Sequence, residues 1–368
     1  MMQLNDKRSI WDKLHLDLPL LIALLAMMGA SLAIVYSASG QNSAMMVRHA
    51  TRMAGAIIGM FILAQFSPAT LKRLVIPMYC AGLLMLVGVL LFGVSSKGAQ
   101  RWLDLGVTRF QPSELMKIAV PMMVAWYIGR NHLPPRALHL VVGFTIVMLP
   151  TLLIKEQPDL GTSILIASSG VFVLFLSGLS WRLIGFLTGL VALAAWPFWH
   201  YGMHAYQKQR VLTLFNPESD PLGSGYHIIQ SKIAIGSGGI EGKGWLQGTQ
   251  SQLEFLPERH TDFIFSVLSE EFGLFGVCLL LCMYLFIIGR GLYIAVNAQD
   301  AFGKLLAGAL TLTFFVYVFV NIGMVSGLLP VVGVPLPLIS YGGTSMVTLM
   351  AGFGIIMSIA TDKRMLLK

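Results

Sequence analysis

The sequence predicts an all-α integral membrane protein that crosses the bilayer about ten times. Hydrophobic residues make up 56% of its 368 residues, and charged residues make up only 11%. The mean hydropathy is +0.75. Soluble domains carry roughly 25% charged residues. A chain with so few charges cannot cover its surface with polar groups, so lipid must solvate most of that surface.

Ten apolar segments are each close to the length of about 20 residues that a helix needs to span the hydrocarbon core. Between the seventh and the eighth, residues 201–262 form one long connection, which we expect to be an extracytoplasmic loop. The sequence shows no internal repeat and no soluble domain, so we expect residues 1–368 to form a single membrane domain. The predicted spans lie near residues 18–37, 47–66, 74–94, 112–129, 138–154, 161–178, 181–200, 263–289, 305–328 and 341–360.

Three pairs of glycines stand four residues apart within these apolar segments. Such a spacing is typical of sites where two membrane helices pack closely. We therefore expect helix–helix contacts at these positions, which are Gly55/Gly59, Gly185/Gly189 and Gly323/Gly327.

The basic residues predict which side of the membrane each loop faces. An even number of spans places both termini on one side, and basic residues are enriched in cytoplasmic loops. With cytoplasmic termini, the inner side holds thirteen basic residues: Lys7, Arg8, Lys13, Lys72, Arg73, Arg130, Arg136, Arg182, Arg290, Lys304, Lys363, Arg364 and Lys368. The short outer loops then hold six: Arg48, Arg52, Lys97, Arg101, Arg109 and Lys155. We therefore expect both termini in the cytoplasm.

The net charge of +8 does not indicate nucleic-acid binding. The basic residues are scattered singly between apolar runs, and no stripe of them could follow a phosphate backbone. Their positions fit loop charges that set membrane topology. We therefore expect no nucleic-acid partner.

The 17 acidic residues are distributed in the opposite way. On the inner side there are only five, Asp6, Asp12, Asp17, Asp300 and Asp362. The other twelve lie in or beside the outer loops that follow spans three, five and seven. Exposure of a long loop explains most of these acids. It does not explain the ionisable residues within or beside apolar runs, which need water or a partner.

Glu114 and Lys117 are two of these membrane-depth charges. Pro112 suits the first turn of a helix. Glu114 and Lys117 then lie three residues apart on one helix face. A purely structural ion pair is one interpretation. We favour a pair that lines a polar cavity, because a lipid-facing pair would gain little over two apolar residues.

Two aspartates lie directly before predicted spans. Asp159 can cap the sixth span, since helix N-termini favour a carboxylate, or it can line a substrate cavity. Asp262 lies where the long outer loop enters the eighth span, beside His260. Thr261 or Asp262 could cap that span. A carboxylate at this boundary could also act as a general base if it reaches a hydroxyl proton. The pattern leaves these alternatives open.

Several motifs along the chain resemble those of one protein family. Residues 321–345 read NIGMVSGLLPVVGVPLPLISYGGTS, and the stretches SKGAQRWLDLG, RFQPSE, QPDLGTS and FLPERHTDFIFSVLSEEFG fit the same pattern. On these motifs the chain resembles the SEDS family (shape, elongation, division and sporulation) along essentially its whole length. The opening WDKLHLD and the compact tails favour the cell-elongation branch over the division branch.

The resemblance implies a peptidoglycan glycosyltransferase of the bacterial cytoplasmic (inner) membrane. Such an enzyme polymerises lipid II into β-1,4-linked glycan strands at the outer face during cell elongation and maintains cell shape. It works within the elongation machinery, with a class B penicillin-binding protein that cross-links the strands. The resemblance also implies that Asp262 is the essential outer-loop aspartate, and that Glu114, Lys117 and Asp159 are functionally sensitive.

The implied reaction needs few groups. Because an α-linked donor becomes a β-linked product, one base suffices, and Asp262 is our candidate. The leaving diphosphate gains charge that fixed cations would stabilise. The candidate cations near the outer face are Arg48, Arg101, Lys117 and Arg210. No metal ligand is assigned, although a divalent cation, Mg²⁺ or Mn²⁺, could share this task.

Two other classes of function remain as alternatives. A lipid II flippase or transporter would need polar groups through the full depth of the membrane, whereas the membrane-depth charges here cluster towards the outer edge. A non-catalytic scaffold that activates a penicillin-binding protein is compatible with every motif. Glycan synthesis beside an inactivated transpeptidase would separate an enzyme from a scaffold.

Overall fold

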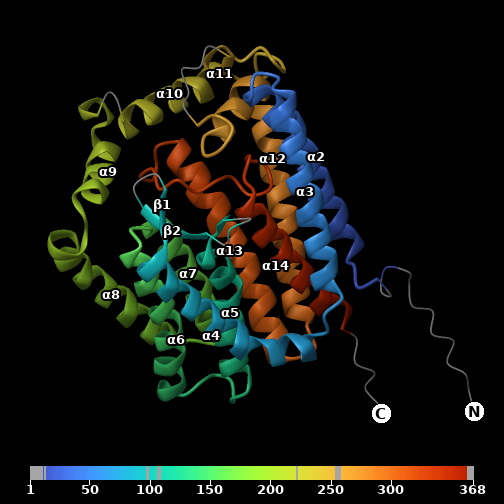
Figure 1. Ribbon diagram of the computed structural model, residues 1–368, viewed down its shortest axis with the longest axis vertical. Helices are drawn as coiled ribbons and strands as arrows, with labels where there is room; N and C mark the ends of the chain where they lie inside the picture. The colour runs from blue at the N-terminus through green and yellow to red at the C-terminus, as the bar shows by residue number, and fades with distance from the viewer. Residues whose placement is uncertain are drawn as a thin grey trace, which may run out of the picture.

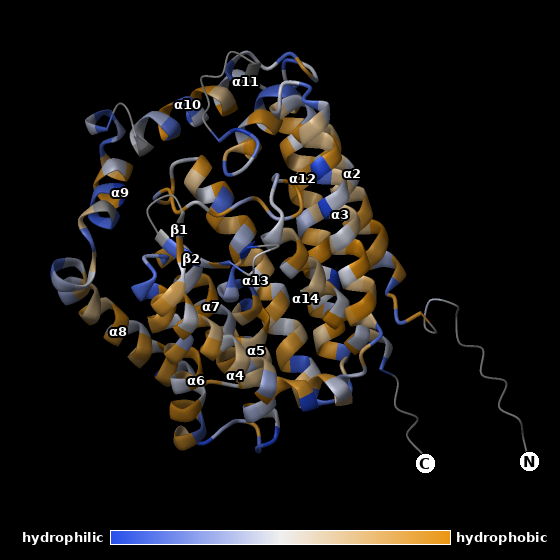
Figure 2. Cartoon of the chain, viewed as in Figure 1, coloured by the Kyte–Doolittle hydropathy of each residue, from blue (hydrophilic) through white to orange (hydrophobic). Residues whose placement is uncertain are grey.

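The computed structural model describes residues 11, 14–96, 99–104, 106, 109–220, 223–252 and 258–362. The described chain is mainly helical, and eight of its helices are long and apolar enough to cross a membrane. Figure 1 shows the helices gathered into a bundle, and Figure 2 shows hydrophobic residues along their lengths. This confirms a membrane protein with many spans. Among the charges counted above, Lys7, Arg8, Lys13, Lys97, Lys363, Arg364, Lys368, Asp6 and Asp12 lie outside the described residues.

Each of the ten predicted apolar segments forms a helix. In chain order they are α2 (Leu18–Ala38), α3 (Ser43–Ala64), α4 (Pro68–Phe92), α5 (Pro112–Gly129), α6 (Ala137–Glu156), α7 (Leu160–Leu176), α8 (Trp181–Pro197), α12 (Ile264–Asn297), α13 (Ala301–Val325) and α14 (Thr344–Thr361). Two of them fall outside the set of eight candidate spans. Helix α7 has 17 residues, and α5 is less apolar because it carries Glu114, Lys117 and other polar residues. The count of ten crossings therefore stays a prediction.

Local sequence explains where several helices begin. The side chains of Asp17, Ser67 and Asp300 cap α2, α4 and α13 by accepting a hydrogen bond from a backbone N–H in the first turn. Such caps satisfy amide groups that have no partner within the helix. Asn42 caps α3 in the same way. That cap starts α3 four residues before the predicted span, because hydropathy alone does not register a polar first turn.

Contacts at one end of the bundle join the two ends of the described chain. His15 Nδ1 lies 3.0 Å from Thr361 Oγ1. Nearby, Arg290 forms two hydrogen bonds, of 3.0 and 2.7 Å, with the Asp17 carboxylate. The start of α2 and the end of α14 therefore lie at the same end of the bundle, as an even number of crossings requires.

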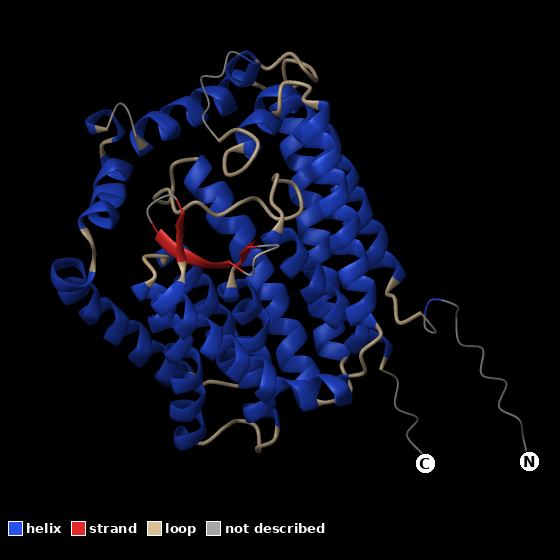
Figure 3. Ribbon diagram, viewed as in Figure 1, coloured by secondary structure: helices blue, strands red, loops and turns tan. Residues whose placement is uncertain are grey.

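The all-α prediction missed a small antiparallel sheet between α4 and α5 (Figure 3). Its strands are β1 (Val94–Ser96), β2 (Ala99–Asp104) and β3 (Arg109–Phe110), in the order β1-β2-β3. Strands β1 and β3 are too short to show a period-two pattern, and β2, which reads AQRWLD, does not alternate apolar and polar residues. In the register of β2 and β3, Asp104 lies opposite Arg109. The sheet carries arginines of the outer region towards the start of α5.

The predicted long loop, residues 201–262, is largely helical where it is described. It contains the end of η1 (Phe198–Gly202), then α9 (Ala205–Phe215), η2 (Pro217–Ser219), α10 (Ser224–Ser237) and α11 (Thr249–Gln252). Figure 1 shows α8 and α9 standing to one side of the bundle, and α10 with α11 across one end. No residue of α8 is buried.

Helix α12 is broken at Gly273, which has φ +60° and ψ −158°. The loop after α10 packs into this break. The backbone N–H of Lys243 donates to Glu270 O (3.0 Å), and that of Gly244 donates to Glu271 O (2.9 Å). A positive φ and this close approach both require glycine at position 273. The predicted span 263–289 therefore consists of two helical pieces.

The glycine prediction was wrong for two pairs. A Cβ built on Gly55, Gly59, Gly185 or Gly189 meets no atom within 4 Å. In the third pair, a Cβ on Gly327 would lie 2.3 Å from Lys232 Cε of α10, so that glycine is closely packed. Close packing also occurs at glycines outside the three pairs. A Cβ on Gly170 would lie 2.3 Å from Val147 Cγ2, where α7 crosses α6. Spacing alone cannot tell a glycine that faces lipid from one that faces a helix.

Candidate active site

A polar pocket of about 250 Å³ lies where α5, α7, α13 and α14 begin or end. We define the polar pocket by the residues that line it, which include Arg101, Glu114, Lys117, Asp159 and Asp262. These residues come from the segments that follow predicted spans three, five and seven and from the first turns of α5. The fold thus brings the candidate base and four of the six candidate substrate-binding residues to one cavity.

Glu114 and Lys117 form the ion pair expected from their spacing. Lys117 Nζ donates to Glu114 Oε1 over 2.7 Å. Each residue is only 8% exposed, and both line the polar pocket. The Lys117 ammonium also lies 5.3 Å from the centre of the Tyr317 ring. Because the pair faces a polar cavity, the structure agrees with the interpretation that we favoured.

Asp159 serves as a cap and also lines the pocket. Its Oδ1 accepts a hydrogen bond from the Thr162 N–H (3.1 Å), at the start of α7. Its Oδ2 lies 3.4 Å from Arg101 Nε. Arg101 Nη2 in turn donates to Pro158 O (2.9 Å). Asp159 can therefore cap α7 and line the cavity at the same time. Arg101 of β2 is held against the same turn.

Asp262 lies in the turn that precedes α12. The N-cap position of α12 is Phe263, and no side chain makes the capping hydrogen bond. Thr261 Oγ1 donates to Glu258 instead. The Asp262 side chain is partly exposed and lines the polar pocket, where its Oδ2 faces Gly333. The capping alternative for Thr261 and Asp262 is therefore not what the structure shows.

Residues of the 321–345 motif hold this turn in place. The Asn321 side-chain amide donates to Asp262 O (2.8 Å) and to Val334 O (2.7 Å). Ser340 Oγ donates to Thr261 O (2.6 Å), and the Tyr341 N–H donates to the preceding carbonyl, His260 O (2.8 Å). Asn321 is fully buried. The motif therefore sets the position of the Asp262 backbone.

A histidine of α10 supports the same turn from another side. The His227 ring stacks on Phe263, with ring centres 5.6 Å apart. Burial lowers the pKa of His227 below its usual value, against the opposing charges of Glu258 and Asp220. His227 therefore packs against Phe263, the residue that follows the candidate base.

The remaining predicted cations are placed less centrally. Arg210 of α9 is exposed, donates to Val331 O (3.1 Å) and lines a pocket of about 70 Å³ that adjoins Arg101 and Asp159. Arg48 is exposed on α3 and is not among the residues that line the polar pocket. Arg210 therefore lines a cavity next to the polar pocket. The structure gives no support for Arg48 as a substrate-binding residue.

A second cavity, the arginine pocket, contains two cations that the prediction did not select. It measures about 590 Å³ and is lined by Arg52, Arg109, Trp102, Gln111 and Glu114, among others. Arg52 lies one helical turn after Arg48. The i, i+4 spacing of these arginines was a usable signal for one cationic helix face.

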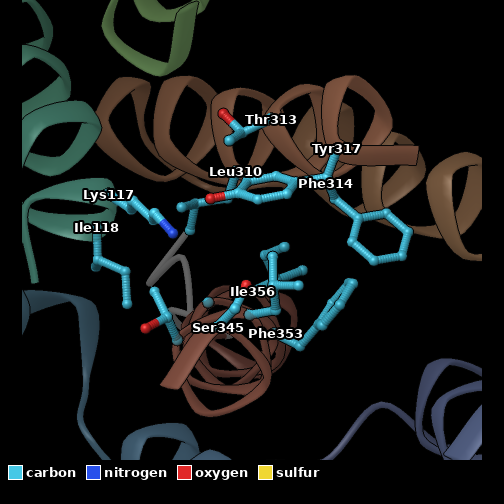
Figure 4. A pocket seen from close by; sticks show the side chains of 12 residues that line it. Lys117, Ile118, Leu310, Thr313, Phe314, Tyr317, Ser345, Phe353 and Ile356 are labelled. Carbon is cyan, nitrogen blue, oxygen red and sulfur yellow. The ribbon is translucent and has the colours of Figure 1, made fainter. Parts of the chain in front are cut away.

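An apolar groove of about 320 Å³ continues from the arginine pocket. It is lined by residues of α3, α4, α5 and α14 together with Phe110 and Glu114. A narrower apolar cavity of about 30 Å³ lies between α5, α13 and α14 (Figure 4). Lys117 and Tyr317 border both this cavity and the polar pocket. The polar groups are thus bordered on two sides by space suited to hydrocarbon.

The described residues contain no group of three His, Cys, Asp or Glu side chains arranged to hold a metal ion. In the polar pocket, Glu114 is paired with Lys117 and Asp159 with Arg101. The described part of the chain thus forms no metal cage of its own, and a divalent cation would have to take most of its ligands from substrate and water.

Together these features define a class of membrane enzyme. One end of a helical bundle holds an acid–base pocket, cations suited to an anionic headgroup and a groove suited to a lipid chain. The chain belongs to the SEDS family, because the family model of the FtsW, RodA and SpoVE proteins, described as "Cell cycle protein", matches residues 12–365.

Individual relatives sharpen this assignment. The chain is 58% identical to the peptidoglycan glycosyltransferase MrdB of Escherichia coli (strain K12) over 363 residues, which cover 99% of this chain and 98% of MrdB. It is 35% identical to the probable peptidoglycan glycosyltransferase FtsW of Trichlorobacter lovleyi, over 95% of this chain and 94% of FtsW. The expected elongation branch is thus confirmed.

Solved structures share the fold. A chain described in work on "polymerization and crosslinking by a peptidoglycan synthase complex" matches with a TM-score of 0.80 and 33% identity, over 94% of this chain and 98% of that one. The rod shape determining protein RodA of Thermus thermophilus matches with a TM-score of 0.72 and 27% identity, over 94% and 97%.

Proposed function

We propose that this chain, a peptidoglycan glycosyltransferase by its full-length similarity to MrdB, polymerises lipid II into β-1,4 glycan strands during cell elongation. The observation that carries the proposal is the polar pocket itself. Asp262 and the Glu114–Lys117 pair line this pocket together, and the neighbouring cavities are lined by Arg210 on the one hand and by Arg52 and Arg109 on the other. A lipid-linked sugar diphosphate has three parts, and the cavities match each of them.

The lipid chain would lie in the apolar groove between α3, α4, α5 and α14. The groove adjoins the arginine pocket through Phe110 and Glu114, so the diphosphate would lie near Arg52 and Arg109. Arginine suits phosphate because its planar guanidinium donates two parallel hydrogen bonds. The sugar would then extend into the polar pocket, towards Asp262.

The chemistry requires one proton transfer and one displacement. The acceptor hydroxyl oxygen attacks the donor's anomeric carbon, and the bond from that carbon to the diphosphate oxygen breaks. The diphosphate leaves with the electron pair, and Asp262 takes the proton of the hydroxyl. Lys117 and the arginines stabilise the charge that develops on the leaving group. Glu114 holds Lys117 in position.

The orientation in the membrane follows from two observations. Basic residues favour the inner side thirteen to six by the count above. The contact between His15 and Thr361 brings both chain ends together, and Thr361 ends the helix α14 whose first residue, Thr344, lines the polar pocket, which supports termini on the side opposite the pocket. We therefore propose ten spans, cytoplasmic termini, and a pocket that opens at the outer face of the bacterial cytoplasmic membrane.

The proposed partner is a class B penicillin-binding protein acting as the transpeptidase. The support is that a chain with the same fold has been solved in work on a peptidoglycan synthase complex. A transpeptidase beside the polar pocket would receive each strand as it forms.

The decisive experiment replaces the base. Asp262→Asn keeps the shape of the side chain and removes its charge. We expect the purified variant to fold and bind its partner, but to make no glycan from lipid II, even with an inactivated transpeptidase. Glu218→Gln removes an exposed outer acid outside the polar pocket and should retain activity. Normal polymerisation by Asp262→Asn would refute the assignment of the base.

A further inference from the structure

Helix α14 begins at the boundary between the polar pocket and the arginine pocket. Its first residue, Thr344, lines both cavities, and so does the preceding Gly343. Gly343 is the N-cap, and no side chain caps the helix. The first backbone bond of the helix runs from the Val347 N–H to Gly343 O (3.3 Å). The amides before Val347 therefore lack partners within the helix, at the positive end of its dipole.

Gly343 allows an arginine to approach this helix end. A Cβ at position 343 would lie 3.3 Å from Arg52 Cδ and Nε. The Arg52 guanidinium also lies 4.9 Å from the centre of the Tyr341 ring. Arg52 is thereby held next to the start of α14, and a side chain at position 343 would crowd it.

A second, independent observation points to a ligand at the same place. Tyr317 of α13 is 2% exposed, yet its hydroxyl oxygen has no partner that meets hydrogen-bond geometry. Buried hydroxyls nearly always have one. Tyr317 lines the polar pocket together with Thr344 and Ser345. Figure 4 shows the ring end of Tyr317 and the ammonium of Lys117 approaching each other across the space that Ser345 borders.

The local charges favour an anion. In the polar pocket, Glu114 is paired with Lys117 and Asp159 with Arg101. Arg52 and Arg109 of the arginine pocket add two further positive charges. Backbone amides at a helix N-terminus, flanked by cations, are a common way to bind phosphate.

We propose that the first turn of α14 forms, with Arg52, Lys117 and Tyr317, the binding site for the diphosphate of the lipid-linked substrate. The proposal rests on the proposed function and adds the part of the chain that holds the leaving group. The free amides and the Tyr317 hydroxyl donate hydrogen bonds to the phosphate oxygens, and the two cations balance their charge. These donors are oriented before substrate arrives, so they stabilise the leaving group without reorganising.

The test places a competing charge at the helix end. In Thr344→Asp, a carboxylate at the first helical position satisfies the helix dipole and repels diphosphate. Thr344 is exposed, so the variant should fold. Ser43→Asp adds the same charge to the first turn of α3, at an exposed position outside the three cavities.

The measurement is the affinity of full-length protein for fluorescent farnesyl diphosphate, with the same fluorophore on farnesol as the uncharged probe. We expect Thr344→Asp to weaken diphosphate binding about tenfold or more, without loss of thermal stability and without any effect on farnesol. Tyr317→Phe should weaken it about threefold or more. Ser43→Asp should bind as the wild type does.

Wild-type diphosphate affinity in Thr344→Asp would overturn the proposal. An equal loss for farnesol, or an equal loss in Ser43→Asp, would overturn it as well, because either would show a non-specific effect. Binding is measured without turnover. A failure here therefore leaves the Asp262→Asn result intact, and a failure of Asp262 as the base leaves this site intact.

Discussion

Removing the Lys117 ammonium should separate the structural role of the Glu114–Lys117 pair from its role in the reaction. At an effective dielectric constant of about 20, unit charges at the observed 2.7 Å separation attract by roughly 6 kcal/mol. Desolvation of two residues that are each 8% exposed offsets part of this attraction. Breaking such a pair by removing one partner typically costs about 3–5 kcal/mol.

Lys117→Met should therefore lower the free energy of unfolding by about 3 kcal/mol, because it leaves the Glu114 carboxylate buried without its partner. The double variant Glu114→Gln/Lys117→Met removes both charges and should recover most of that stability. Neither variant should polymerise lipid II at a measurable rate, because the cation that stabilises the leaving diphosphate is absent from both. Stability is read from the denaturant unfolding of purified protein in detergent, and activity from the glycan products on gels.

Arg290→Gln serves as the matched control. It breaks the bidentate pair with Asp17 at the opposite end of the bundle. It should cost stability but leave the turnover number of the folded protein unchanged. If the double variant polymerised lipid II at the wild-type rate, Lys117 would be a structural ion only, and the reasoning about the pocket would be refuted.

Two further predictions concern positioning and packing. Asn321→Leu removes the amide that joins Asp262 O to Val334 O, so kcat should fall about tenfold or more while KM for lipid II changes less than about twofold. An unchanged kcat would show that the amide does not position the base. Gly170→Val places side-chain atoms against Val147 and should destabilise the protein by about 1–3 kcal/mol. Gly185→Val meets no neighbour and should stay within about 0.5 kcal/mol in the same thermal unfolding assay; equal losses would contradict the packing argument.

The order of the helices was predictable because each segment that crosses the lipid must be apolar along its own length, and the hydropathy of that segment records this. All ten apolar segments form helices. Polar caps such as Asn42 and Ser67 start α3 and α4 several residues before the predicted spans, whereas α14, which has no side-chain cap, starts three residues after its predicted bound. The spacing of Glu114 and Lys117 similarly predicted a shared face, because residues three apart in a helix lie next to each other on its surface.

The choice among the outer arginines was not predictable in the same way. Arg48 and Arg52 lie one turn apart on α3, but only Arg52 packs against Gly343, whose position depends on how α14 crosses α3. The sheet that carries Arg101 and Arg109 was missed because β1 and β3 are very short and β2 does not alternate apolar and polar residues. Tyr317 was also missed. In the sequence it is one aromatic residue in an apolar run, and only the packing of α5 against α13 brings Lys117 to its ring.

The sequence by itself determined that lipid surrounds most of this protein, the order of its helices and its family. It also singled out Glu114, Lys117, Asp159 and Asp262 as candidate site residues. These follow from composition, local spacing and motif, which are properties of neighbouring residues. Only the tertiary structure decided that these residues share one cavity, that Asn321 holds the Asp262 turn, and that the start of α14 faces Arg52. The physical reason is that such contacts join segments far apart in the chain, and their geometry depends on helix packing that no local pattern records.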